Sequence, residues 1–438
     1  MKAHAEFRCF SGGDGRWPLT QPIYRCPDGG LLDVQHDLAA LKARSGQGWR
    51  ALFNERRAEG RSPYSSGVWR YKEWVLPELA DEHIVTTEEG NSRLLKNDRL
   101  AAALGLKKLW LKQCGESHTG SFKDLGMTVL VSQVKQALAE GANIRAIGCA
   151  STGDTSAALA AYGALAQIPV VVLLPRGKVS TAQLVQPIAH GARVLALDTD
   201  FDGCMAIIQS LAEEGVLYLA NSMNPLRIEG QKTVVMEIVQ QLGWRVPDWV
   251  VLPSGNLGNG YAMYRGFSLM KELGVIDRIP RLMLAQAENA NPLYLAHRAG
   301  RDTVDPVTAK KTLASAIQIG NPVSAPRALK ALAAMDGVVE QASEQELADT
   351  GAQADAMGLY VCPHTAVALA ATKKLVAAGT VGKDEEVVVI STAHGLKFTE
   401  SKVRYHEDAL HEQGVVAHHQ NPPVELPADL DAVRRALS

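Results

Sequence analysis

Short apolar runs of strand length alternate with longer stretches of helical period from about residue 100 onward. Alternation of this kind predicts parallel sheets whose two faces are covered by helices. Strands are expected at residues 109–111, 144–148, 169–174, 194–197, 249–252, 281–285 and 387–390. Helices are expected at residues 122–139, 156–165, 181–190 and 261–273. The pattern therefore predicts an α/β fold with two parallel-sheet domains, in which ligands bind beyond the carboxyl ends of strands.

The two ends of the chain lack this pattern. Residues 1–85 are rich in Gly, Pro, Trp and Arg, which predicts an irregular extension with short helices, and a polar tail follows residue 401. Within the extension, Cys9 and Cys26 stand where a zinc ribbon would begin its two cysteine pairs, but glycine occupies the second position of each pair. Two thiolates cannot close a four-coordinate zinc site. We therefore expect either a metal-free remnant of a ribbon or two unrelated cysteines.

Composition narrows the class of protein. A chain of 438 residues suits two domains with terminal extensions. Its 46% hydrophobic and 21% charged residues are typical of a soluble globular protein. Its net charge is −2, and it has no cluster of Lys and Arg of the kind that binds nucleic acid. No apolar run approaches the ~20 residues that cross a bilayer. The first residues lack a signal-peptide core and soon reach Glu6 and Arg8, so a cytoplasmic location is expected.

The turn at residues 117–124 places Lys123 after an expected strand, in the first turn of the following helix. A positive charge there opposes the helix macrodipole. A desolvated lysine with a lowered pKa is the form that makes imines with carbonyl compounds. The alternative is a surface lysine after a helix cap. A Walker phosphate loop is excluded, because Ser121 occupies the position of its lysine.

Two further strand-to-helix turns have anion-binding chemistry. Residues 151–156 combine hydroxyl groups and Asp154 with a helix N-terminus, which suits a carboxylate or phosphate, although the same residues make good helix caps. Residues 253–260 are rich in glycine, so backbone N–H groups can turn towards a phosphate; the alternative is a plain glycine-rich turn. One phosphate-bearing cofactor would explain both turns together with Lys123.

Two more segments complete the set. Arg227 closes the polar segment 221–227 and can bind phosphate as a bidentate fork, unless it is a surface residue of a structural turn. Residues 391–397 follow the last expected strand and offer the hydroxyl of Thr392 to a ring nitrogen. A buried structural role is the simpler reading of His394, and no metal-binding spacing occurs among the 12 histidines.

Together these motifs resemble the threonine synthase family, which belongs to the fold type II pyridoxal-phosphate enzymes of the tryptophan synthase β superfamily. The resemblance covers nearly the whole chain, and it points to the plant-type branch at residues 118–128, 148–158, 230–233, 253–259 and 391–397. It implies a carbon–oxygen lyase that converts O-phospho-L-homoserine and water to L-threonine and phosphate by β,γ-elimination and hydration. It also implies pyridoxal 5'-phosphate as the cofactor and a homodimer as the assembly.

The resemblance further implies a role for each matching residue, with no metal. Lys123 would bind the cofactor as an imine and act as the catalytic base and acid. The cofactor would also contact Asp154 at its 3′ oxygen, Thr392 at its ring nitrogen, and Gly255, Asn256, Leu257, Gly258 and Asn259 at its phosphate. The substrate carboxylate would bind Ser151, Thr152 and Thr155, and the substrate phosphate Asn221, Ser222 and Arg227. The implied large cofactor domain comprises residues 86–130 and 213–400, the small substrate domain residues 131–212, and the tail residues 401–438.

Two other functions stay open. A serine or threonine dehydratase or a β-replacing synthase shares this fold, but its substrate has no γ-phosphate to be bound. The phosphate-binding residues of segment 221–227 therefore distinguish a threonine synthase from these enzymes. A non-catalytic relative would lack Lys123 or the phosphate loop, and both are present. Plant-type members are activated by S-adenosylmethionine, but residues 90–96 follow their pattern only in part, so we do not transfer that activator site. No plastid address is expected.

Overall fold

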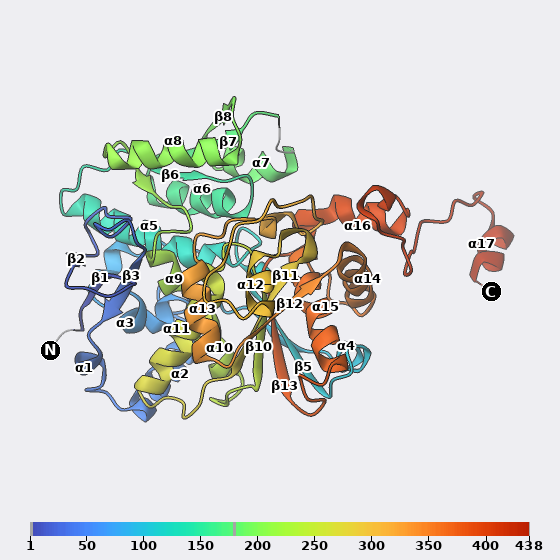
Figure 1. Ribbon diagram of the computed structural model, residues 1–438, viewed down its shortest axis with the longest axis horizontal. Helices are drawn as coiled ribbons and strands as arrows, with labels where there is room; N and C mark the ends of the chain where they lie inside the picture. The colour runs from blue at the N-terminus through green and yellow to red at the C-terminus, as the bar shows by residue number, and fades with distance from the viewer. Residues whose placement is uncertain (1–2, 178–180, 438) are drawn as a thin grey trace.

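The computed structural model describes residues 3–177 and 181–437, in which three sheets organise the chain (Figure 1). The strands are β1 (Ala5–Cys9), β2 (Arg16–Pro18), β3 (Leu32–His36), β4 (Leu94–Lys96), β5 (Lys108–Gln113), β6 (Ile147–Ala150), β7 (Val170–Pro175), β8 (Arg193–Leu197), β9 (Tyr218–Leu219), β10 (Trp249–Pro253), β11 (Arg281–Ala287), β12 (Val338–Ala342) and β13 (Glu386–Ser391). The helices are α1 (Leu38–Leu41), α2 (Gly46–Glu59), α3 (Lys72–Val75), α4 (Asp98–Ala103), α5 (Lys123–Ala139), α6 (Asp154–Ala166), α7 (Thr181–Ala189), α8 (Phe201–Glu213), α9 (Leu226–Gln231), α10 (Thr233–Gln241), α11 (Gly258–Glu272), α12 (Pro292–Arg298), α13 (Ala325–Ala334), α14 (Glu344–Ala356), α15 (Pro363–Ala377), α16 (Thr399–His406) and α17 (Leu430–Leu437). None of the helices in these described ranges is long and apolar enough to span a lipid bilayer.

The large sheet has six strands in the order β12-β11-β10-β13-β5-β4. Its strands are parallel except β4, which runs antiparallel to β5 at the edge. Every residue of β10 and β13 is buried, as expected for parallel strands that helices cover on both faces. The α/β prediction is therefore confirmed. Strand β12 was not predicted, because its sequence Val-Val-Glu-Gln-Ala carries too short an apolar run to signal a strand.

The small sheet has four parallel strands in the order β8-β7-β6-β9, and it forms the upper layer of Figure 1 with α6, α7 and α8. The chain leaves the large sheet after β5, builds the small sheet, and returns through α9 and α10 to β10. Because β9 pairs with β6, the small sheet extends to residue 219. Strand β9 lies beyond residue 212, where the small domain was expected to end, and its two residues give no recognisable hydrophobic pattern in the sequence.

The N-terminal segment is more regular than predicted. It contains the antiparallel sheet β2-β1-β3 and the 14-residue helix α2. The sheet is fastened to the main body: the Asp33 carboxylate accepts a hydrogen bond of 2.6 Å from the Tyr261 hydroxyl on α11, and Arg327 on α13 donates to the carbonyl of Leu32. The sequence did not reveal these strands, because the short period-two burial of β1 and β3 is masked by the surrounding glycines and prolines.

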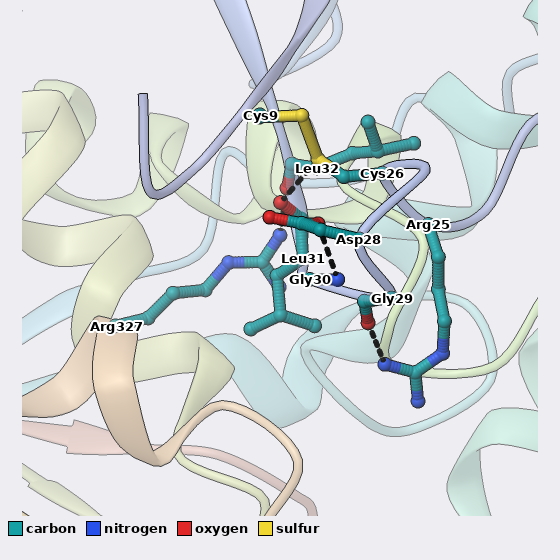
Figure 2. Close-up of a disulfide and its surroundings, with 9 residues drawn as sticks. All are labelled: Cys9, Arg25, Cys26, Asp28, Gly29, Gly30, Leu31, Leu32 and Arg327. Atoms are coloured by element: carbon teal, nitrogen blue, oxygen red, sulfur yellow. Dashed lines mark hydrogen bonds between the residues drawn. A yellow bond between two sulfur atoms is a disulfide. The ribbon is translucent and has the colours of Figure 1, made fainter. Parts of the chain in front are cut away.

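Figure 2 shows that Cys9 and Cys26 form a disulfide, with Cα atoms 5.6 Å apart. The bond ties the end of β1 to the loop that precedes β3, so the alternative of two unrelated cysteines is wrong. The carboxylate of Asp28 lies close by, and its oxygen accepts a hydrogen bond of 2.9 Å from Gly30 N. Arg327 reaches into the same close-up from α13, so the disulfide loop lies against the main body of the molecule.

Helices α5 and α9 pack unusually closely, because glycines replace side chains at their contact. A Cβ atom on Gly126 would lie 2.9 Å from the carbonyl oxygen of Arg227. A Cβ atom on Gly230 would lie only 1.7 Å from the carbonyl oxygen of Leu125. The backbones of the two helices are therefore in direct contact, and neither can move towards the other.

Replacing Gly230 with alanine is expected to lower the free energy of unfolding by about 1–3 kcal/mol, because the new methyl group must force α5 and α9 apart. Urea unfolding of the cofactor-free protein measures this change. Gly48→Ala in α2 is the matched control, since its methyl group meets only the side chains of Arg44 and Ser45, at 3.0 and 3.3 Å. Equal unfolding midpoints for the two variants would show that the helix contact is looser than described.

Candidate active site

The candidate site lies where turns from both sheets meet. The turns after β5 and β13 are joined by backbone hydrogen bonds of 2.9 Å, from Phe122 N to Thr392 O and from His394 N to Gly120 O. The turn after β6 is joined to the segment before α9, since the side chain of Asn221 bonds the backbone N–H and C=O of Ala150 at 3.0 and 2.9 Å. The two groups of turns lie side by side, because the Nζ atom of Lys397, in the segment after β13, lies 2.8 Å from Asp154 Oδ1 at the start of α6.

Lys123 is the first residue of α5, and the structure gives it the properties of a reactive amine. The residue is only partly buried, and its Nζ lies 3.9 Å from the centre of the Phe122 ring. Desolvation and, to a smaller extent, the positive charge of Arg227 lower the pKa of Lys123 to about 7, against the opposing effect of the negative charge of Asp154. A large fraction of this amine is neutral at neutral pH and can therefore attack a carbonyl carbon.

The turn after β6 begins helix α6 at Asp154, whose side chain is buried. The hydroxyl oxygen of Ser151 accepts hydrogen bonds of 3.3 Å from Gly153 N and Ser156 N. Thr152 and Thr155 remain partly exposed beside it. The helix N-terminus, its hydroxyl groups and their accessibility suit a carboxylate ligand.

Arg227 is a buried cation whose charge is not neutralised. Its guanidinium donates to the carbonyl of Ala220 at 3.2 Å and to the hydroxyl of Thr155 at 3.4 Å, while its buried Nε has no partner. No carboxylate of residues 3–177 or 181–437 forms an ion pair with it, and burial lowers its pKa to about 10. A buried guanidinium without a counterion is unfavourable unless an anion binds to it.

Asn221 and Ser222, which precede Arg227 in the same segment, differ in their contacts and exposure. Both hydrogen-bonding ends of the Asn221 amide already bond the backbone of Ala150, so this residue fixes the turn geometry. Ser222 is partly exposed beside it. Asn221 therefore positions this turn and has no free end of its amide left for a substrate. The sequence could not show this role, because the bonded residues lie 71 positions apart.

The glycine-rich turn after β10 leads directly into α11. Gly255 is packed so tightly that a Cβ atom would lie 2.9 Å from Ile317 Cα, and Leu257 has a φ of 69°, in the left-handed region. Asn256 holds the turn by accepting hydrogen bonds from Val323 N and Ser324 N, at 3.4 and 3.2 Å. Helix α11 begins at Gly258, so the free N–H groups of its first turn, which includes Asn259, are available to an anion such as phosphate.

The turn after β13 contributes Thr392, which is buried. Its hydroxyl lies 4.0 Å from the sulfur of Cys362, at the start of α15, and the Ser391 hydroxyl accepts a hydrogen bond of 3.3 Å from Thr365. Burial alone would raise the pKa of Cys362, but the charge of His364 and hydrogen bonds from His364 and Thr365 lower it to about 7. This thiol was not predicted as a site residue, because only the fold brings it beside Thr392.

Lys397 was also missed, although it ends the motif at residues 391–397. Its Nζ lies 2.8 Å from a carboxylate oxygen of Asp154. The sequence shows a lysine after a histidine and glycine, which is a common surface pattern, and it gives no sign that the amine reaches the turn after β6.

Comparisons with known proteins agree with this geometry. The family model described as pyridoxal-phosphate dependent enzyme matches residues 85–393. Threonine synthase 2, chloroplastic, of Arabidopsis thaliana is 54% identical over 96% of this chain and 82% of the relative. Threonine synthase of Methanocaldococcus jannaschii is 37% identical over 98% of both chains. The crystal structure of threonine synthase from Escherichia coli, at 20% identity, superposes with a TM-score of 0.67 over 99% of both chains, which shows a shared fold.

The comparisons also correct one prediction. The relative that is 54% identical is a chloroplastic protein, and this finding overturns the expected cytoplasmic location. The expectation rested on the absence of a recognisable address in the first residues of the chain.

Proposed function

Because the chain belongs to the threonine synthase family of pyridoxal-phosphate-dependent enzymes, we propose that it converts O-phospho-L-homoserine and water to L-threonine and phosphate. The single observation that supports this substrate is Arg227, a buried guanidinium with no carboxylate partner among the described residues. A γ-phosphate would supply the missing counterion, whereas the substrates of a dehydratase carry no such group.

The residues of the site fit the cofactor. Lys123 offers a desolvated amine, and the turn from Gly255 to Asn259 offers backbone N–H groups at the start of a 15-residue helix. Pyridoxal phosphate, when bound, supplies an aldehyde that bonds amines and a ring that takes up negative charge from the amino acid. We propose that Asp154 lies at its 3′ oxygen and that the Thr392 hydroxyl faces its ring nitrogen.

We assign the remaining residues to the substrate. Ser151, Thr152 and Thr155 would hold its carboxylate at the N-terminus of α6, and Arg227 with Ser222 would hold its phosphate. Lys123, close to both groups, would move protons between the Cα, Cβ and Cγ atoms as a general base and acid. Burial of Arg227 keeps bulk water from its guanidinium and strengthens its interaction with a bound anion.

We propose that the large sheet carries the cofactor and the small sheet the substrate carboxylate, and that the working assembly is a homodimer. The division of labour is supported by Lys123 and the glycine-rich turn following strands of the large sheet, while Ser151 follows a strand of the small one. The homodimer rests on the family alone, and light scattering on the purified protein measures it directly.

Turnover of purified, cofactor-loaded protein tests the reaction. Threonine and inorganic phosphate are expected to appear in equal amounts from O-phospho-L-homoserine. Ammonia release from L-serine and L-threonine is measured in parallel, since this is the reaction of a dehydratase. Faster deamination of either amino acid than phosphate release would reject the proposed function in favour of a dehydratase.

The pH dependence of cofactor uptake tests the state of Lys123. Because its pKa is about 7, the rate at which cofactor-free protein takes up pyridoxal phosphate should rise with pH and be half-maximal near pH 7. An ordinary lysine, with a pKa of about 10.4, would still gain reactivity above pH 9. Stopped-flow absorbance between pH 5.5 and about 9.5 follows the reaction, within the range in which only the neutral amine attacks. Pyridoxal, which has no phosphate to titrate, is the control and should give the same midpoint.

A further inference from the structure

We propose that Lys397 is a positioning residue of this site, which joins the Asp154 turn of the small sheet to the Thr119 turn of the large sheet and balances the charge of Asp154. The proposal deepens the function given above and rests on it in one respect, that Asp154 faces the cofactor. Lys397 itself is not expected to touch the substrate.

The ammonium group of Lys397 has three acceptors, one on each of three segments. Its Nζ lies 2.8 Å from Asp154 Oδ1, 2.9 Å from Thr119 O and 3.1 Å from Gln186 Oε1. An ammonium group has three N–H donors, so this arrangement uses all of them. Asp154 begins α6 and Gln186 lies in α7, whereas Thr119 lies in the turn after β5. One side chain therefore connects both sheets at the site.

The fold makes room for this side chain at one particular place. Gly120 has a φ of 82°, and a Cβ atom there would lie 3.0 Å from Cδ of Lys397. The alkyl stem thus passes over a glycine and brings the charge into the site. The side chain is 20% exposed and that of Asp154 is 8% exposed, so the ion pair is largely removed from water. Removing one partner of such a pair leaves an uncompensated buried charge.

Lys397 also fixes the turn that carries Lys123. The carbonyl of Thr119 accepts hydrogen bonds from Lys397 and, at 3.1 Å, from Gln186, while its N–H donates to Asp124 at 2.7 Å. Both the N–H and the carbonyl of Thr119 are therefore hydrogen-bonded to side chains. Because Thr119 lies only four residues before Lys123, a displaced turn would displace the reactive amine.

The pair acts on Lys123 electrostatically as well. The negative charge of Asp154 raises the pKa of Lys123 against the lowering effects of burial and Arg227. Lys397 Nζ lies 2.8 Å from Asp154 Oδ1 and so fixes the position of this carboxylate. Lys397 therefore influences the cofactor-bearing amine through the placement of Asp154 as well as through the Thr119 turn.

Lys397→Met, which keeps an apolar stem of similar length and removes the charged amine, tests the proposal. It should lower kcat/KM for O-phospho-L-homoserine by about 10- to 100-fold, as when the support of a functional group is lost. It should also change the absorbance spectrum of the bound cofactor and its pH dependence, which a merely structural lysine would not do. Lys397→Arg should restore the spectrum in part, because it keeps the positive charge.

Lys402→Met is the matched control. Lys402 forms a similarly buried pair with Asp355, with side chains 14% and 15% exposed, but this pair joins α16 to α14 and does not bond the Asp154 or Thr119 turn. It should leave the cofactor spectrum unchanged. Circular dichroism and thermal unfolding of both variants separate a loss of positioning from a loss of folding.

A double substitution isolates the link to Asp154. In an Asp154→Asn background, Lys397→Met should reduce kcat/KM by a smaller factor than in the unmodified enzyme, since the charge that Lys397 balances is gone and only its bonds to the Thr119 turn and Gln186 are lost. An undiminished effect there, or a Lys397→Met spectrum identical to that of the unmodified holoenzyme, would overturn the proposal. The spectrum does not depend on the substrate: a protein that fails to turn over O-phospho-L-homoserine while Lys397→Met still alters its spectrum would reject the proposed reaction and retain this assignment.

Discussion

Replacing Lys123 with alanine is expected to reduce turnover of O-phospho-L-homoserine by more than about 1,000-fold, because both covalent cofactor binding and proton transfer depend on its amine. Phosphate release measures the loss of turnover. The absorbance band of the imine between protein and cofactor should disappear in the same variant, and borohydride should no longer fix the cofactor to the chain.

Lys135→Ala is the control for this variant. Lys135 lies on the same helix α5, but its amine donates to the carbonyl of Glu82 at 2.9 Å at the protein surface. Its loss should leave both the spectrum and the rate unchanged. A Lys123→Ala protein that kept the imine band would move the covalent bond to another lysine, and the assignment of the site would have to be abandoned.

Replacing Arg227 with methionine is expected to lower kcat/KM by about 10²- to 10⁴-fold. The guanidinium would form two charge-assisted hydrogen bonds with the substrate phosphate, each contributing about 1.5–3 kcal/mol. Arg227→Lys keeps a positive charge but loses the fork, so its activity should lie between those of methionine and arginine. Steady-state kinetics and inhibition by inorganic phosphate measure both effects, and phosphate should inhibit the methionine variant only weakly.

The same variant has a second signature that does not involve substrate. Arg227 lowers the pKa of Lys123, so the midpoint of cofactor uptake should move upward from pH 7 when the guanidinium is removed. If neither phosphate inhibition nor this midpoint changes, Arg227 is a structural residue and the argument for a phosphate substrate fails.

The sequence contained the parts of this site whose signal is local. Three segments each lie between a strand and a helix: those that contain Lys123, Asp154 and the turn from Gly255 to Asn259. The hydrophobic period of a strand and that of a helix can both be read along the chain. The position of these turns at strand carboxyl ends is enough to place them together. This is why the turns that carry Lys123, Asp154 and the glycine-rich segment could be located at strand ends without coordinates.

The residues that the sequence did not reveal depend on contacts between distant segments. Lys397 bonds the carbonyl of Thr119, 278 positions away, and Asn221 bonds Ala150, 71 positions away. Cys9 and Cys26 needed the antiparallel pairing of β1 with β3 to bring them together. A hydrophobic pattern reports the period of one element, and it has no information about which side chains meet across the fold.

The contact between α5 and α9 has a consequence for substrate length. Lys123 lies at the start of α5, Arg227 lies in α9, and the two helices touch through Gly126 and Gly230. The amine that we propose to act at Cα and the guanidinium that we propose to bind the phosphate are thus carried by two helices whose separation is fixed by backbone contact. We therefore expect the enzyme to discriminate against substrate homologues that are one methylene longer or shorter, unless these glycines are changed.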